Sequence, residues 1–439
     1  MKLFAHLLFQ EGGRSWEGFA VSLCVVFAFS SATVAWATAL PSAPPEHVGL
    51  SVERLARIGA ALTAAIQRGQ FPGAVALVAR KGRIAYFESF GLLDQSSGAP
   101  MPKEAIFRIY SMTKPITSVA AMMLVEEGRL VLTDPVSKFL PPLAKLEVSV
   151  EGTDPATGMA SYSTVPAKRE MTIHDLLRHT SGLVYRGFTA HAQVKELYTK
   201  GGVGWQGLTA TEQIERLAKV PLAHQPGTTF EYGLSTDVLG RVIETIAGVT
   251  LGQFFEERIF APLRMTDSGF FVPQDKLGRL AQPFATDPAT GKPSKLVDVT
   301  APPKNDSGGG GGVTTAGDYA RFLQMLLNGG QLDGVRLLSR TTVSYMTSDH
   351  LGEIKSAGAV ALMPPIGFGL GFAVRKETGI AAWPGSAGEY YWGGAAGTGF
   401  WVDPQEELIC ILMTQAAPGA PRRYDRQLFK QLVYQAIND

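Results

Sequence analysis

The sequence is short of several features that mark common protein classes. It has two cysteines, Cys24 and Cys410, in 439 residues, which are too few for a disulfide framework. Its 40 basic and 39 acidic side chains nearly cancel, and no long basic run occurs, so nothing favours a nucleic-acid partner. A Gly-x-Ser-x-Gly elbow is also missing, because Gly233–Asp237 and Pro384–Gly388 each lack one glycine. This argues against an α/β-hydrolase triad.

Signals for a metal or a cofactor are missing as well. The chain has no His-Glu-x-x-His motif, and His174 and His179 are spaced wrongly to share one helix face, so we interpret both as structural. The glycines of 306–312 precede an expected helix over 315–328, but no Gly-Lys-Ser/Thr and no strand accompany them. We therefore predict a flexible or closely packed backbone loop there, and neither a metal nor a cofactor.

Charge is absent from one long N-terminal stretch, Gly18 to Pro45. Its apolar residues 21–30 followed by Ala35-Trp36-Ala37 are typical of a signal peptide, and the uncharged run is also long enough to span a bilayer. We expect export to the periplasm or medium, by a cleaved signal or by an uncleaved anchor that associates with the membrane. The alternative is a mis-set start codon. Residues 1–45 are left out of the fold prediction.

The remaining chain is rich enough in apolar residues, 45% overall, to bury a sizeable core. Periodicity predicts terminal helices, strands near both ends and helices with little strand between them. The expected helices are 51–70, 173–179, 210–219, 237–247, 251–259 and 424–436, and the expected strands are 73–80, 83–90, 368–374, 389–392, 399–402 and 408–414. This order predicts an α+β fold: an antiparallel sheet from 46–131 and 299–439, with a mostly helical domain, 132–298, inserted.

One stretch has the pattern of an activated nucleophile. Ser111-Met-Thr-Lys114 is the only Ser-x-x-Lys in the sequence, and a helix is predicted from here to Gly128, with Pro115 in its first turn. Residues three apart on a helix share a face, so the Ser111 hydroxyl and the Lys114 amine are expected within reach of each other. A desolvated lysine can act as the base that a serine alcohol needs. Serine is also a common helix N-cap, which is the structural alternative.

Two further segments fit the same chemistry. Tyr232 lies in a loop before the helix expected at 237, where it can act as a general base and acid beside a lysine, although a core tyrosine is the alternative. Gly393-Gly394 follows Trp392 at the end of a strand and allows close backbone approach, so that the N–H of Ala395 can donate to an oxyanion. A plain β-bulge is the alternative for these glycines.

Together these motifs carry a resemblance that extends from about Leu50 to the C-terminus. The order Ser111-x-x-Lys114, Tyr232-Gly-Leu234 and Trp392-Gly393-Gly394 resembles the class C β-lactamase and penicillin-binding-protein superfamily, and in particular the family VIII carboxylesterases. The supporting segments are 130–135, 171–182, 388–394 and 400–404.

The resemblance implies roles for these residues. Ser111 would be the acylated nucleophile, Lys114 and Tyr232 the base system, and the N–H groups of Ser111 and Ala395 the oxyanion hole. Trp392, Gly393, Gly394 and Tyr391 would contact the substrate. The reaction would be acyl transfer to water through an acyl-enzyme, acting on a small-molecule ester with a short-to-medium acyl chain.

Two departures from the lactamase pattern bear on the substrate. Trp392 stands where the lactamases have a lysine that helps to receive a carboxylate, and Leu234 stands where asparagine is common. Both changes favour neutral esters over anionic β-lactams. The alternatives that stay open are a β-lactamase, a D-alanyl-D-alanine peptidase, and a penicillin-binding-like sensor that is acylated without turnover.

Overall fold

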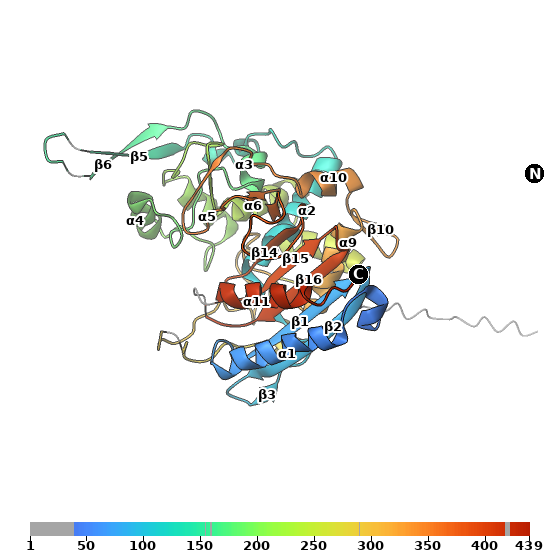
Figure 1. Cartoon of the computed structure of the whole chain (residues 1–439). Helices are drawn as coiled ribbons and strands as arrows, with labels where there is room; N and C mark the ends of the chain where they lie inside the picture. Colours follow the sequence, from blue (N-terminus) through green and yellow to red (C-terminus); the bar gives the residue numbers. More distant parts are fainter. Residues whose placement is uncertain (1–38, 154, 159, 289, 418–421) are drawn as a thin grey trace, which may run out of the picture. The chain divides into compact units, whose positions relative to one another are not determined.

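Eight antiparallel strands from the two ends of the chain form the central sheet of this computed structural model, in the order β12-β13-β14-β15-β16-β1-β2-β3 (Figure 1). The structure describes residues 39–153, 155–158, 160–288, 290–417 and 422–439. The strands are β1 Gly73–Arg80, β2 Arg83–Asp94, β3 Ala99–Pro100, β12 Ile366–Phe368, β13 Ala373–Arg375, β14 Tyr390–Gly393, β15 Gly399–Asp403 and β16 Leu408–Thr414. The predicted α+β fold, with its sheet built from both ends of the chain, is confirmed.

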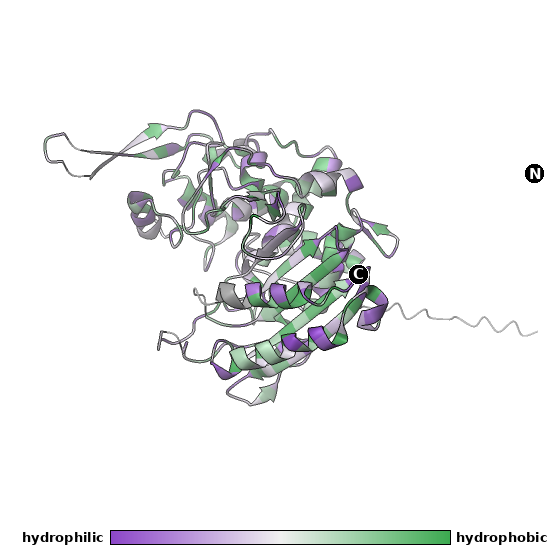
Figure 2. Cartoon of the chain, in the orientation of Figure 1, coloured by the Kyte–Doolittle hydropathy of each residue, from purple (hydrophilic) through white to green (hydrophobic). Residues whose placement is uncertain are grey.

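Helices cover both faces of this sheet. Helices α1 (Val52–Gln67) and α11 (Arg422–Tyr434) lie side by side on one face. Helices α2 (Thr113–Glu126) and α9 (Ala316–Leu327) pack on the other. Because both faces are covered, every residue of β1 and β16 is buried, and their sequences are apolar runs rather than alternating patterns. Figure 2 shows these strands as mainly hydrophobic, whereas α1 carries hydrophilic residues on its outer side.

The segment between α2 and α9 contains most of the remaining helices. They are α3 Ile173–Leu177, α4 Ala192–Lys200, α5 Ala210–Leu217, α6 Ser235–Ala247, α7 Leu251–Phe255 and α8 Ala261–Leu263, with a π-helical turn at Glu256–Phe260. Helix α10, Arg340–Met346, follows α9. The 3-10 turns are Pro45–Val48, Tyr110–Met112, Val136–Lys138, Pro141–Leu143 and Gln274–Arg279.

Small strand pairs tie these segments together. They are β4 Phe107–Arg108 with β8 Val313–Thr314, β7 Thr229–Glu231 with β11 Lys355–Ala357, β9 Gln331–Leu332 with β10 Val335–Arg336, and β5 Glu147–Thr153 with β6 Ala160–Pro166. The pairing of β4 with β8 places the segment before Ser111 next to the glycine-rich segment. Both therefore reach the same end of α2.

The helical segment corrects the prediction of little strand there. The hairpin β5–β6 projects from it at the left of Figure 1. Val148 is buried at the base of the hairpin, whereas Val150 and Tyr162 are each 40% exposed farther out. Such a half-exposed hairpin has only a weak alternation of apolar and polar residues, which does not stand out in the sequence. Helix α4 was not predicted either.

Two other boundaries differ from those predicted. The strand expected over 368–374 is two short strands, β12 and β13, because the chain reverses at Gly369–Phe372 with Gly371 at a φ of 97°. Residues 40–45, predicted as part of the uncharged leader, belong to the fold: the N–H of Ile84 donates to Pro41 O (2.8 Å), and Leu40 is buried. The rest of the predicted leader, residues 1–38, lies outside the described residues.

The described residues between 39 and 439 form one compact unit. A single apolar core extends from Val75 and Leu77 of the sheet to Leu176 and Val238 of the helical segment. The boundaries predicted near residues 131 and 298 thus separate two parts of one core. Among the described residues, no single helix is long and apolar enough to cross a membrane. The bent pair of helices Ser235–Ala247 and Leu251–Leu263 is long and apolar enough when the two are counted together, by length and composition only.

Candidate active site

Ser111 lies at the start of α2, in the 3-10 turn Tyr110–Met112. Tyr110 has a φ of 45°, a left-handed conformation that a bulky residue adopts only when its surroundings enforce it. Two contacts hold it there: the hydroxyl of Thr113 donates to Tyr110 O (2.6 Å), and the N–H of Val297 donates to the Tyr110 hydroxyl (3.2 Å). The reversal at Tyr110 leaves Ser111 partly exposed, although almost all of α2 behind it is buried.

Lys114 is fully buried, and its amine has three oxygen partners. It lies 3.4 Å from Ser111 Oγ, 3.2 Å from the Tyr185 hydroxyl and 2.6 Å from Gly309 O. In the neutral form that a general base requires, an amine has two N–H groups and one lone pair. If Gly309 O and the Tyr185 oxygen accept the two hydrogens, the lone pair is left for the hydroxyl of Ser111. The spacing of Ser111 and Lys114 thus places them in contact, and the third partner comes from the glycine-rich segment.

That segment, 306–312, is a closely packed backbone loop. A Cβ at Gly309 would lie 2.2 Å from Asp237 Oδ2, and one at Gly312 would lie 2.7 Å from Thr113 Oγ1. The hydroxyl of Thr117 on α2 donates to Gly308 O (2.8 Å). The glycines therefore bring the backbone carbonyls against α2 at a distance that a larger residue would prevent.

Tyr185 was not among the predicted site residues, but it contacts Lys114 directly. Its hydroxyl accepts from Lys114 Nζ and donates to Asp237 Oδ2 (3.0 Å), and Ser307 Oγ donates to the other oxygen of Asp237. Burial and the Asp237 carboxylate raise the pKa of Tyr185 well above its ordinary value. The group is therefore a neutral phenol that links the lysine to a buried carboxylate.

Tyr232 is in the same group of side chains, though not in the arrangement expected of a base. Its ring lies 4.6 Å from Lys114 Nζ, and its hydroxyl accepts a long hydrogen bond of 3.4 Å from Trp392 Nε1. Within the described part of the chain, no hydrogen bond joins the Tyr232 hydroxyl to Ser111 or Lys114. Its base role remains a prediction, and Tyr185 is the tyrosine whose hydroxyl touches the lysine.

His179 supports Tyr232 from behind. The imidazole is buried with its ring 4.9 Å from that of Tyr232, and its Nδ1 accepts from the N–H of Gly233 (3.4 Å). Burial and the charge of Lys114 lower the pKa of His179 well below its ordinary value, so it is neutral. His174 contacts His350 instead, with 3.0 Å between ring nitrogens. Among the described residues, no group of three or more His, Cys, Asp or Glu is placed to hold a metal ion.

The turn after β14 lies against the backbone before Ser111. A Cβ at Gly394 would be 2.3 Å from both Ile109 O and Thr398 Oγ1, and the N–H of Gly394 donates to Thr398 O (2.8 Å). Ala395, the next residue, lies in an exposed turn. A Cβ at Gly393 would overlap Arg426. Both glycines of the predicted oxyanion turn are therefore required by close packing.

Tyr391 lies on the opposite face of β14 from Trp392. Residues alternate along β14, so Trp392 and Tyr390 share one face of the sheet and Tyr391 occupies the other. The ring of Tyr391 lies 5.4 Å from Lys430 Nζ of α11, and Trp392 contacts Tyr232 and Phe368. Tyr391 also packs on the cluster that contains Tyr232, and its substrate contact stays a prediction.

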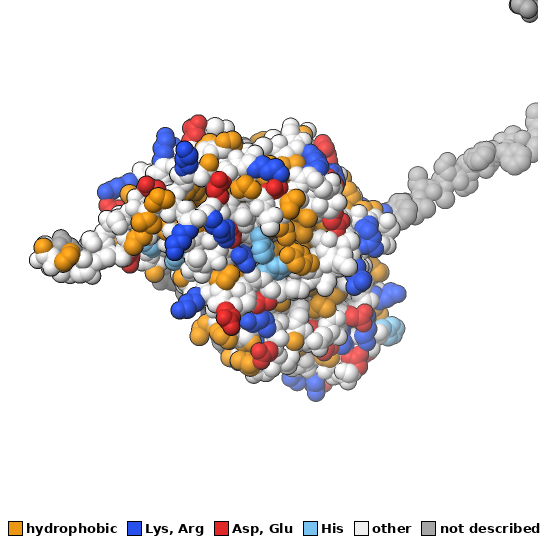
Figure 3. All heavy atoms as spheres, turned by 90° about the horizontal axis from the view of Figure 1, so that it is seen from above, with side chains coloured by type: hydrophobic (Ala, Val, Ile, Leu, Met, Phe, Trp, Pro, Cys, Tyr) orange, Lys and Arg blue, Asp and Glu red, His pale blue; other side chains and the backbone are white. Residues whose placement is uncertain are grey.

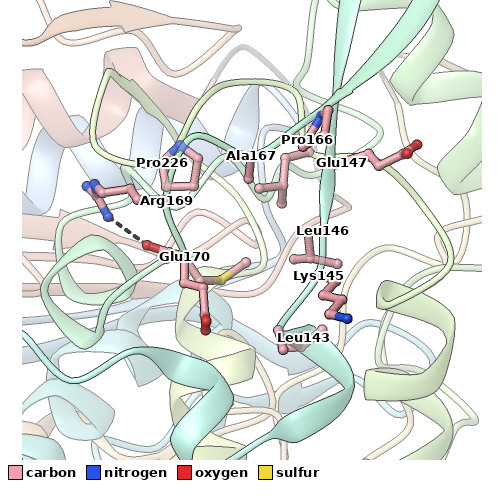
Figure 4. A pocket seen from close by; sticks show the side chains of 12 residues that line it. Leu143, Lys145, Leu146, Glu147, Pro166, Ala167, Arg169, Glu170 and Pro226 are labelled. Carbon is pink, nitrogen blue, oxygen red and sulfur yellow. Dashed lines mark hydrogen bonds between the residues drawn. The ribbon is translucent and has the colours of Figure 1, made fainter.

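A separate pocket of about 410 Å³ lies in the helical segment, between the base of hairpin β5–β6 and the turn at Pro141–Leu143 (Figure 4). Its lining includes Leu143, Leu146 and Pro226, and it has no hydroxyl or thiol nucleophile. On the face of the molecule seen in Figure 3, acidic and basic side chains are interspersed. Neither feature indicates a reaction site other than the one at Ser111.

A family model described as Beta-lactamase matches residues 58–435. The chain belongs to the beta-lactamase family. The relatives of this beta-lactamase-family protein include Protein Rv1367c of Mycobacterium tuberculosis, 36% identical over 80% of this chain and 87% of that protein. Esterase EstB of Burkholderia gladioli is 31% identical over 82% of this chain and 90% of its own length.

Among solved structures, EstCE1, a hydrolase with promiscuous acyltransferase activity, has a TM-score of 0.73 and 29% identity, and the match covers 87% of this chain and 99% of EstCE1. EstB and EstCE1 confirm the expected resemblance to family VIII esterases within the β-lactamase and penicillin-binding-protein superfamily. This beta-lactamase-family protein is thus a serine hydrolase or acyltransferase.

Proposed function

We propose that this protein is a serine carboxylesterase that hydrolyses small neutral esters through an acyl-enzyme on Ser111. The observation that carries the proposal is the environment of Lys114. Its buried amine touches Ser111 Oγ, while Gly309 O and the Tyr185 hydroxyl take its other hydrogen-bonding positions. A lysine held in this way is an adjacent base for a serine nucleophile.

In this reaction Ser111 Oγ attacks the ester carbonyl and passes its proton to Lys114 Nζ. The negative charge on the carbonyl oxygen is received by the N–H groups of Ser111 and Ala395, and the close packing of Gly394 against Ile109 O supports this assignment. The protonated amine then gives its proton to the departing alcohol. Water then attacks the acyl carbon and gives a proton to Lys114 Nζ, which passes it to Ser111 Oγ as the bond from Oγ to the acyl carbon breaks and the carboxylic acid leaves.

The preference for neutral esters rests on two residues. Trp392 lies where the lactamases have a cation, and its indole N–H is directed at the Tyr232 hydroxyl rather than at a substrate carboxylate. Leu234 is buried, with 3% of its surface exposed, so it presents no amide donor to an acylamino group. An anionic substrate would thus lose charge-assisted hydrogen bonds that a neutral ester does not need.

The test is turnover of p-nitrophenyl acetate, p-nitrophenyl butyrate and a chromogenic cephalosporin by the purified protein and by Ser111→Ala. We expect ester turnover that is lost in the variant, with slow or no cephalosporin hydrolysis. Faster turnover of the cephalosporin would favour a β-lactamase or peptidase and would overturn the inference that Trp392 favours neutral esters. A single burst without steady turnover would identify an acylating sensor. Ester hydrolysis that survives Ser111→Ala would refute the site.

A second candidate is acyl transfer to an alcohol. It is favoured by relatives such as the monacolin J acid methylbutanoyltransferase of Aspergillus terreus, 29% identical over 81% of this chain and 89% of its own length. An acyl-serine reacts with an alcohol as it does with water. Measuring butyl butyrate formed from p-nitrophenyl butyrate and 1-butanol separates the two fates of the acyl-enzyme.

We also propose export, on the basis of the uncharged N-terminal run. Fractionation of cells that express the full chain tests this. Activity that remains in the cytoplasmic fraction would contradict it.

A further inference from the structure

Phe188 is a large aromatic side chain at the surface beside the active-site tyrosines. It is 39% exposed, yet its ring is stacked on Tyr232 with 6.1 Å between centroids and 30° between planes. It also meets Tyr185 edge-on, with 5.9 Å between centroids and 89° between planes. Tyr185 and Tyr232 are the two tyrosines that contact Lys114. Phe188 is thus the outer layer of an aromatic group whose inner layer touches the candidate base.

The backbone holds Phe188 firmly in this position. Its N–H donates to Tyr185 O (2.9 Å), and its carbonyl accepts from the N–H of Ala359 (2.8 Å). A Cβ at Gly358 would lie 3.1 Å from the Phe188 carbonyl, so the segment after β11 packs closely against it. The ring is thus held with one face against Tyr232 and part of its surface toward solvent.

The position of Phe188 identifies the part of the ester it would meet. The group that returns the proton to the departing alcohol must lie within hydrogen-bonding distance of the ester oxygen. Here that group is Lys114, with Tyr185 and Tyr232 around its amine. The alcohol part of a bound ester therefore extends toward the tyrosines, and Phe188 lies on their outer side. The acyl part extends in another direction from the carbonyl carbon.

The surroundings of this surface are also apolar. Trp392, partly exposed, packs against Tyr232, and Val360, Leu362 and Trp383 pack on the same cluster from the segments after β11 and β13. Ring pairs in offset or edge-to-face contact are favourable beyond the area they bury. An aromatic alcohol fits this environment better than a short alkyl one.

We propose that Phe188 is a specificity-determining residue that binds the alcohol part of the ester, and that the preferred substrates are esters of aromatic alcohols. This assignment rests on the proposed esterase function. It concerns substrate choice and leaves the chemistry at Ser111 unchanged.

The test compares kcat/KM for 2-phenylethyl acetate and ethyl acetate, which share an acyl group and have alkyl alcohols of similar acidity. We expect the wild type to prefer the phenylethyl ester. Phe188→Ala should lower kcat/KM for that ester by about threefold to tenfold more than for ethyl acetate, the range of one ring–ring contact. Phe188→Tyr should retain the preference.

Phe271→Ala is the matched control, because Phe271 is another exposed phenylalanine, 38% exposed, that belongs to no ring pair with the active-site residues. An equal loss for both acetates in Phe188→Ala, or no loss, overturns the specificity role while the esterase function stands. A loss that appears for ethyl phenylacetate but not for 2-phenylethyl acetate overturns the assignment to the alcohol side. If the wild type hydrolyses neither ester, the proposed function fails and this assignment fails with it.

Discussion

Tyr185→Phe removes one hydroxyl and should show whether the orientation of the Lys114 amine depends on its hydrogen bond to Tyr185. That hydroxyl accepts from Lys114 Nζ at 3.2 Å and donates to Asp237 Oδ2 at 3.0 Å. Without it, one hydrogen of the lysine amine has no acceptor, and its lone pair is no longer restricted to the direction of Ser111. The ring itself and its contact with Phe188 remain.

The magnitude follows from the kind of hydrogen bond that is lost. A buried N–H left without its acceptor costs about 1–3 kcal/mol, so kcat/KM should fall by about 5- to 150-fold. The buried Asp237 also loses a donor, which should lower the free energy of unfolding by about 1–3 kcal/mol and the Tm by a few degrees. Because the pKa of Tyr185 is raised well above its ordinary value, the phenol is neutral at working pH. The substitution should therefore lower kcat/KM at every pH and leave both limbs of the pH–rate profile in place.

The assay is kcat/KM for p-nitrophenyl butyrate over a pH series, beside thermal unfolding. Tyr86→Phe is the control, since Tyr86 lies on the opposite face of the sheet, among residues that pack against α1 and α11. A Tyr185→Phe enzyme that keeps kcat/KM within about threefold of the wild type would refute the role of this hydroxyl in positioning Lys114. An equal loss in Tyr86→Phe would assign the effect to general destabilisation.

Two further predictions concern the backbone and pH. Gly394→Ala should lower kcat by about 100-fold or more with little change in KM, because the added Cβ would displace the oxyanion turn. The control is Gly278→Ala, which should be neutral because a Cβ at Gly278 would meet no atom within 4 Å. A wild-type kcat in Gly394→Ala would contradict the argument from close packing. Asp175→Asn should destabilise the fold by about 2 kcal/mol at neutral pH. Burial would raise the pKa of Asp175, but hydrogen bonds from Arg169, Thr172 and Thr180 and the charge of Arg169 lower it to about 2. Since the pKa in the folded state lies below the unfolded value of about 3.9, this stabilisation is present above about pH 4 and is lost toward about pH 2. Chemical unfolding at several pH values should show the difference between wild type and variant shrinking as pH falls; a constant difference would contradict the argument.

The sequence predicted those parts of the molecule that depend on local geometry. The hairpin of β1 and β2 follows from two apolar runs joined by Lys81-Gly82, and β16 was predicted with its observed bounds. The contact of Ser111 with Lys114 follows from their spacing, because residues three apart at a helix start face the same way. The hairpin β5–β6 was missed since it packs only at its base and has a weak pattern.

The order of motifs along the chain was sufficient to place this protein in its family, because Ser111, Tyr232 and Trp392 each belong to a recognisable short sequence motif. Only the tertiary structure decided which groups surround Lys114. Gly309 lies 195 residues after the lysine and Tyr185 lies 71 residues after it, and neither belongs to a helix or strand that predicts its direction. Their positions depend on loops packed between the sheet and the helical segment. A spacing in sequence sets the direction of side chains on one helix, whereas contacts between distant loops depend on the packing of the whole core.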